Sequence, residues 1–160
     1  MPDQQLVEMV AAALAGRMIA TAESCTAGRI AEALASVENA SEFLRGGLVS
    51  YQEQVKRQHL GVAAASVYSA EAAEQMAAGV ADLLGAEVTV ATTGVAGDEL
   101  QDGVAPGTVF IATSVDGVVS SAMHRFRGSR GEICDQARTQ ALRDLLTALS
   151  NGVVPRPRLR

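Results

Sequence analysis

The sequence predicts an α/β fold: a three-layer sandwich with a mainly parallel central sheet, an antiparallel hairpin and helices on both faces. Three observations predict it. Short apolar and β-branched runs alternate along the chain with segments of helical periodicity. Apolar strands without polar alternation, such as residues 87–92, are typical of sheets covered on both faces. Two further strand patterns flank Asp116-Gly117, a dipeptide that favours a type I′ hairpin turn.

The helices are predicted from periodicity and from their end signals. Gly16 ends the first helix, and Gly85 ends the fourth, which opens with the capping residue Ser69 and carries Glu71 in its first turn. The predicted helices span residues 3–15, a stretch through Ile30, Ala33 and Leu34, and residues 52–59, 69–84 and 130–149. The predicted strands span residues 17–21, 48–51, 87–92, 108–115 and 118–126.

One domain is expected, covering residues 1–150, with a flexible tail at residues 151–160. The loop at residues 93–106 holds three glycines and is long enough to be functional rather than a simple connection. No internal repeat or low-complexity segment interrupts the domain.

Composition excludes several classes of partner. The net charge is −5, and with three Phe, two Tyr and no Trp there is no aromatic platform for bases, so no nucleic-acid partner is expected. No apolar stretch reaches the roughly 18 residues that span a bilayer, so no membrane partner is expected. Cys25 and Cys134 lack metal-binding spacing, and the N-terminus lacks a signal-peptide pattern. We therefore expect a cytoplasmic protein with reduced thiols.

Ser24, Cys25 and Thr26 stand at the junction of a predicted strand and the following helix. A hydroxyl there lies at the carboxyl end of a strand, where α/β proteins bind ligands. Unpaired N–H groups at the helix start can hold a phosphate or a developing oxyanion. The alternative is that Ser24 or Thr26 simply caps the helix. Cys25 is itself a candidate nucleophile, although such a cysteine is more often a small buried apolar residue.

Tyr51 and Lys56 form a second candidate pair, five residues apart across a strand-to-helix junction. A serine nucleophile needs a base, and a lysine can serve when its pKa is lowered from about 10.4 toward neutrality by burial or a neighbouring cation. Tyr51 could share a proton with it. The alternative is a solvated Lys56 on a helix surface and a Tyr51 packed at a sheet end.

The segment Thr93-Gly94-Val95-Ala96-Gly97 follows a buried strand and forms a third candidate. Its glycines let the backbone approach a ligand, and successive N–H groups can form an anion nest. It is no P-loop, because no Gly-Lys-Ser/Thr follows. Arg130 lies in a basic stretch that could meet a substrate phosphate, although a solvated helix face is the commoner meaning.

These segments, in this order, resemble the CinA C-terminal domain family, which includes stand-alone nicotinamide mononucleotide amidohydrolases. Residues 21–28, TAESCTAG, are similar to the family's T-A-E-S-C-T-G-G signature. Residues 43–51 with Lys56 and residues 60–62 resemble its second signature. Residues 93–97, residues 107–109 and the pattern Phe126-x-Gly128-x-Arg130 match the remainder. The resemblance covers roughly residues 5–150.

The resemblance implies hydrolysis of the carboxamide of nicotinamide mononucleotide, which gives nicotinate mononucleotide and ammonia and recycles pyridine nucleotides. It implies that Ser24 is the nucleophile, that Lys56 is its base and that Tyr51 assists the proton transfers. It further implies no metal, no cofactor, a small-molecule mononucleotide as partner and a homodimer. Carried over residue by residue, the oxyanion and substrate contacts are Cys25, Thr26, Gly28, Thr93, Gly94, Gly97 and Arg130.

The sequence departs from the family pattern at several positions around this site. Ala27, Asp98 and Cys134 stand where glycine, proline and arginine are usual, and Val104-Ala105-Pro106 replaces Lys-Pro-Val. A methyl group at Ala27 is expected to narrow the site, and Cys134 removes a contact to phosphate or ribose. These departures motivate a second hypothesis: a catalytically altered or inactive paralogue that acts as a nucleotide-binding or assembly module.

Overall fold

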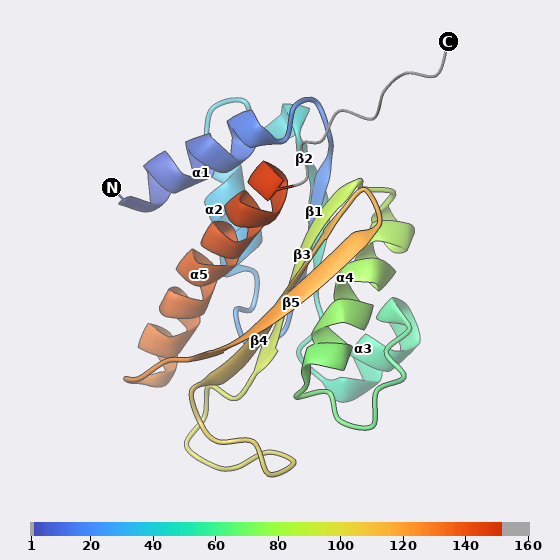
Figure 1. Ribbon diagram of the computed structural model, residues 1–160. Helices are drawn as coiled ribbons and strands as arrows, with labels where there is room; N and C mark the ends of the chain where they lie inside the picture. The colour runs from blue at the N-terminus through green and yellow to red at the C-terminus, as the bar shows by residue number, and fades with distance from the viewer. Residues whose placement is uncertain (1, 152–160) are drawn as a thin grey trace.

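The structure is a computed structural model that describes residues 2–151, and it shows one five-stranded sheet between two helical layers (Figure 1). The strand order is β2-β1-β3-β4-β5. The strands are β1 (Ile19–Glu23), β2 (Leu44–Val49), β3 (Val88–Gly94), β4 (Thr108–Val115) and β5 (Val118–Arg125). The helices are α1 (Pro2–Ala13), α2 (Arg29–Ala35), the 3₁₀ turn η1 (Ala40–Glu42), α3 (Glu53–Leu60), α4 (Ala70–Leu84) and α5 (Arg130–Asn151).

The sheet is parallel only in part. β1 pairs in parallel with β2 and β3, whereas β3–β4 and β4–β5 are antiparallel. The predicted hairpin therefore forms one edge of the sheet and is not inserted within it. Its turn is as predicted, because Asp116 and Gly117 both have positive φ, 51° and 84°, as a type I′ turn requires.

Each face of the sheet has its own apolar core. Alternate side chains of β1 divide between them, with Ile19 in the cluster beneath α1, α2 and α5, and Ala20 and Ala22 in the cluster beneath α3 and α4. Small side chains at Ala20 and Ala22 let α4 pack closely on the sheet. Both faces being covered explains the apolar strands that predicted the fold class.

Two strands begin two or more residues away from their predicted starts. β1 begins at Ile19 and not at Arg17. The Arg17 guanidinium binds the Leu14 carbonyl in the preceding turn (Nε–O 2.8 Å) and Asp116 in the turn between β4 and β5 (Nη1–Oδ2 2.8 Å). β2 begins at Leu44 and includes Gly47, which pairs with Thr21 of β1. A Cβ at Gly47 would collide with the Thr21 hydroxyl, so glycine belongs to the strand here.

The helix ends follow the predicted signals. The Ser69 hydroxyl accepts the Ala72 N–H at 3.1 Å at the start of α4, and Gly85 ends that helix with φ 65°. Of the tail expected at residues 151–160, Asn151 is the last residue of α5 and the rest lies outside the described residues. Among residues 2–151, no helix combines the length and the hydrophobicity needed to cross a bilayer.

Candidate functional site

A pocket of about 230 Å³ opens where β1 and β3 end, at the edge of the sheet that faces the start of α5. Three candidate segments from the sequence meet there: the turn after β1, the residue after β2 and the glycine loop after β3. The pocket is lined by Ser24, Cys25, Tyr51, Tyr68, Gly94, Val95, Gly97, Gln101 and Arg130. Because carboxyl ends of parallel strands share one edge, the fold itself brings these segments together.

Glu23, the last residue of β1, anchors the turn that carries Ser24. Its carboxylate is 1% exposed and accepts four hydrogen bonds of 2.8–3.0 Å, two from hydroxyls and two from backbone N–H groups at the start of α2. The donors are Thr21 Oγ1, Thr26 Oγ1, Ile30 N and Ala31 N. The four donors stabilise the buried negative charge of Glu23. The carboxylate in turn accepts N–H groups that the first turn of α2 would otherwise leave without a partner.

Glu23→Gln is expected to lower the free energy of unfolding by about 3 kcal/mol. The substitution replaces one carboxylate oxygen with an NH₂ group, which cannot accept the hydrogen bonds that the surrounding hydroxyl and N–H groups donate. Urea unfolding followed by circular dichroism measures this change. Glu32→Gln on the exposed side of α2 is the matched control, and we expect it to change stability by less than about 0.5 kcal/mol. Equal effects of the two substitutions would contradict the anchoring role.

The Ser24 side chain lines the pocket and has no internal partner. The residue is 5% exposed, and its hydroxyl makes no hydrogen bond to any residue from 2 to 151. The backbone N–H of Ser24 donates to the Thr92 carbonyl at 3.1 Å. The backbone N–H groups of Cys25 and Thr26 bond to no other described residue. Of these two residues, Cys25 lines the pocket. A free hydroxyl followed by a free N–H group is the arrangement that acyl transfer requires of a nucleophile and an oxyanion donor.

Lys56 lies in the protein interior beside this turn. It is the single lysine of the 160-residue sequence, and it is 2% exposed although it belongs to the short helix α3. Burial lowers the pKa of Lys56 from 10.5 to about 8, while the Glu53 carboxylate raises it. A lysine that loses its proton near pH 8 can act as a base, which an arginine cannot.

The Lys56 ammonium donates to the backbone carbonyl of Tyr51 at 3.0 Å. No hydrogen bond joins it to Ser24 among the described residues, although its charge acts on the adjacent Cys25. The Tyr51 side chain is 58% exposed at the pocket mouth, so the tyrosine meets the lysine through its backbone.

Cys25 is a poor nucleophile in this environment. Burial raises the pKa of its thiol from 9.0 to about 12, so the thiol stays protonated at neutral pH. Cys134 of α5 packs below the same turn, and its thiol donates to the Cys25 carbonyl at 2.9 Å. This contact ties the start of α5 to the turn that carries Ser24.

Four sequence-predicted site residues are not among the residues that line the pocket: Thr26, Gly28, Lys56 and Thr93. Thr26 is fully buried with its hydroxyl on Glu23 and Thr92, and the Thr93 hydroxyl binds the Val67 carbonyl at 2.6 Å. Gly28 has φ 95° and precedes α2, so it shapes the turn without lining the pocket. Ala27 has φ 48° and an exposed side chain outside the pocket, so its methyl group does not narrow the site as expected.

Gly94, Gly97 and Arg130 do line the pocket. A Cβ at Gly94 would lie 2.6 Å from the Thr108 carbonyl oxygen, so glycine allows the close approach of β3 to β4. Arg130 opens α5 with its guanidinium against Gly97, and it makes no ion pair with any residue that the structure describes. An unpaired guanidinium at the pocket wall suits a phosphate.

Sequence reasoning missed two lining residues, Tyr68 and Gln101. Tyr68 lies just before the cap of α4, and Gln101 forms an isolated bridge with Val104 in the loop after β3. Neither belongs to a recognised motif. The one signal for Tyr68 was its rarity, since the chain has only two tyrosines.

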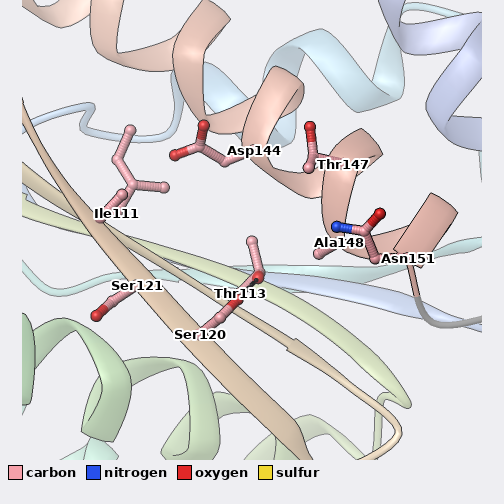
Figure 2. A pocket seen from close by; sticks show the side chains of 9 residues that line it. Ile111, Thr113, Ser120, Ser121, Asp144, Thr147, Ala148 and Asn151 are labelled. Carbon is pink, nitrogen blue, oxygen red and sulfur yellow. Dashed lines mark hydrogen bonds between the residues drawn. The ribbon is translucent and has the colours of Figure 1, made fainter.

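A second groove of about 220 Å³ lies between β4, β5 and α5 (Figure 2). Several of its polar side chains already have hydrogen-bond partners. Thr113 and Ser120 share a hydrogen bond of 3.0 Å, and the Asp144 carboxylate binds His124 and Gln140 at 2.8 Å each. Its lining includes none of the sequence-predicted site residues, whereas the Ser24 pocket is lined by several of them, so the Ser24 pocket is the better candidate. Within residues 2–151, no group of three or more His, Cys, Asp or Glu residues could hold a metal ion.

Comparison with known proteins agrees with this geometry. Residues 3–149 match the CinA C-terminal domain family. A CinA-like protein of Mycolicibacterium gilvum (strain PYR-GCK) is 41% identical over 152 residues, which are 91% of this chain and 36% of that protein. The chain thus spans about a third of the length of that relative.

Solved structures show the same fold. The crystal structure of a competence or damage-inducible protein from Enterobacter asburiae has a TM-score of 0.88 at 33% identity, covering 92% of this chain and 98% of that one. A competence-damaged protein (CinA) superfamily protein from Escherichia coli has a TM-score of 0.86 at 31% identity, covering 91% and 90%. The chain therefore belongs to the CinA C-terminal domain family.

Proposed function

We propose that the chain hydrolyses the carboxamide of nicotinamide mononucleotide, with Ser24 as nucleophile and Lys56 as base. The observation that carries the proposal is the Ser24 hydroxyl, which lines the pocket and has no hydrogen-bond partner among residues 2–151. Lys56 of α3 supports it as a buried amine whose pKa is about 8. An amide is a weak electrophile, so its hydrolysis needs both an activated nucleophile and prearranged oxyanion donors.

In the proposed reaction the Ser24 oxygen attacks the carboxamide carbon and its proton passes to Lys56. The backbone N–H of Cys25, a residue that lines the pocket, binds the oxyanion that forms. Lys56 returns the proton to the leaving nitrogen as the C–N bond breaks, which releases ammonia and leaves an ester on Ser24. Water, which gives a proton to Lys56, then attacks the ester carbon; as the bond to Ser24 breaks, Lys56 passes that proton to the Ser24 oxygen, which releases nicotinate mononucleotide and restores the hydroxyl. Arg130 holds the phosphate, and Tyr51 borders the path of the protons.

A second candidate function is a nucleotide-binding module without turnover. Lys56 donating to the Tyr51 carbonyl, and not to Ser24, favours this alternative. Ammonia release from nicotinamide mononucleotide separates the two, with free nicotinamide as the control that lacks the ribose phosphate. We expect release from the mononucleotide alone. Thermal stabilisation by the mononucleotide without any ammonia would support the binding module and refute the hydrolase.

We also propose that the chain acts as a homodimer. β5 is an edge strand of the sheet, and its side chains Val118 and Met123 are 73% and 55% exposed. An exposed apolar edge strand favours pairing with another strand. Light scattering should give about twice the 16.5 kDa chain mass; a mass of one chain at micromolar concentration would exclude the dimer.

A further inference from the structure

Tyr68 is a pocket residue that the proposed chemistry does not use. Its ring is half-buried and packs against the apolar core beneath α4, while the residue lines the same pocket as Ser24 and Tyr51. The Ser66 side chain fixes its backbone, because Ser66 Oγ accepts the Tyr68 N–H at 3.1 Å. The following residue, Ser69, caps α4. Tyr68 is therefore held in place by a helix cap and not by a free loop.

An acidic side chain accompanies Tyr68. The Ser66 hydroxyl donates to Asp102 Oδ2 at 2.7 Å, so one hydroxyl links the backbone of Tyr68 to the tip of the loop after β3. Burial and then the charge of Asp102 raise the pKa of the Tyr68 phenol. Glu53 is neutralised by Arg57 at 2.8 Å, whereas Asp102 has no ion-pair partner among the described residues. The Asp102 carboxylate therefore acts on the Tyr68 phenol as a negative charge that no ion pair neutralises within the described residues.

The two tyrosines of the chain border one pocket without stacking on each other. His124 and Phe126 form the one stacked aromatic pair within residues 2–151. Tyr51 follows β2, which runs beside the strand that carries Ser24, and Tyr68 precedes α4. Aromatic faces near an unpaired carboxylate attract a cation placed over them.

The proposed substrate has a cation at the required place. The pyridine ring of nicotinamide mononucleotide is positively charged at its glycosidic nitrogen, and its carboxamide must reach Ser24. We propose that Tyr68 is a specificity-determining residue that receives this charged ring, with the charge of Asp102 adding attraction. The inference rests on the proposed function and deepens it: the site selects a cationic aromatic ring over an uncharged ring of the same size.

Binding to the Ser24→Ala protein tests the inference without turnover. Calorimetry would compare nicotinamide mononucleotide with its reduced form, whose ring is uncharged. We expect Tyr68→Leu to weaken binding of the charged form about tenfold and to change binding of the reduced form less than about threefold. Tyr68→Phe keeps the aromatic face and should stay within about threefold of the parent for both ligands. Asp102→Asn should weaken the charged form alone.

Equal losses of affinity for the two ligands on Tyr68→Leu substitution would overturn the inference. It would also be overturned if the Ser24→Ala protein with Tyr68 intact bound the two forms equally well or bound neither. If the Tyr68→Leu protein does not fold, Tyr68→Phe and Asp102→Asn still test the inference, because both variants keep an aromatic ring at position 68. Failure of the proposed hydrolysis looks different: the parent would prefer the charged ring through Tyr68 and yet release no ammonia. Unchanged ring preference in all three variants, in a protein that does release ammonia, would reject the role of Tyr68 alone.

Discussion

Ser24→Ala is expected to lower kcat for ammonia release from nicotinamide mononucleotide by about 10⁴-fold or more, since nucleophile removal abolishes the covalent route. Its hydroxyl bonds to no described residue, so the fold loses nothing with it. The measurement is coupled-enzyme detection of ammonia, with the melting temperature recorded beside it. The substitution separates chemistry from stability because the position is set by the backbone of the turn and by Glu23.

Ser41→Ala is the matched control, an exposed serine in η1 that bonds to nothing through its side chain among the described residues. It should keep the parent rate. Parent-level ammonia release by Ser24→Ala would reject the serine mechanism, because Cys25 beside it has a thiol pKa of about 12 and cannot replace the hydroxyl at neutral pH.

Lys56→Met is expected to lower kcat/KM by about 10³-fold, within the range for loss of a general base. Methionine fills the buried space without a titratable group, so the fold should persist. In the parent, kcat/KM should rise with pH through a midpoint near 8, because only the neutral amine accepts the serine proton and burial lowers the pKa of Lys56 to about that value. The pH profile from 6 to 9.5 measures this directly.

Because the chain has a single lysine, its ionisation can be observed without interference. Lysine-selective ¹³C labelling gives one side-chain signal, and its titration should share the midpoint of the pH profile. Lys56→Arg is the matched cationic variant and should be as inactive as Lys56→Met, since guanidinium keeps its proton. A lysine signal that titrates above pH 10, or an active Lys56→Arg enzyme, would remove Lys56 from the role of base.

Periodicity and turn chemistry were enough to predict the fold class. Ser69, Gly85 and Asp116-Gly117 act locally, and each ends or begins its element as expected. The edge position of the hairpin was not predictable, because strand order depends on packing between segments far apart in sequence. The start of β1 was also misplaced: Arg17 precedes the strand and binds Asp116, 99 residues away.

The candidate site was predicted in part. The turn after β1 and the glycine loop after β3 were found because their residues belong to recognisable motifs. The role of Glu23 was missed, since its four donors come together only when the turn folds back on α2. The burial of Lys56 was also hidden, because a polar helix such as residues 53–60 is typical of a solvated surface.

The carboxylate of Glu23 has a consequence for which parts of the site can change during evolution. By holding the first amides of α2, it should make Ile30 and Ala31 exchange hydrogen as slowly as the sheet, although helix starts normally exchange fast. The loop at residues 97–103 is mostly exposed and should exchange quickly. We therefore expect the turn that carries Ser24 and the loop at residues 97–103 to open in separate local unfolding events. Under the proposed function, we expect substitutions in the loop to change which amide is accepted while Ser24 stays in place.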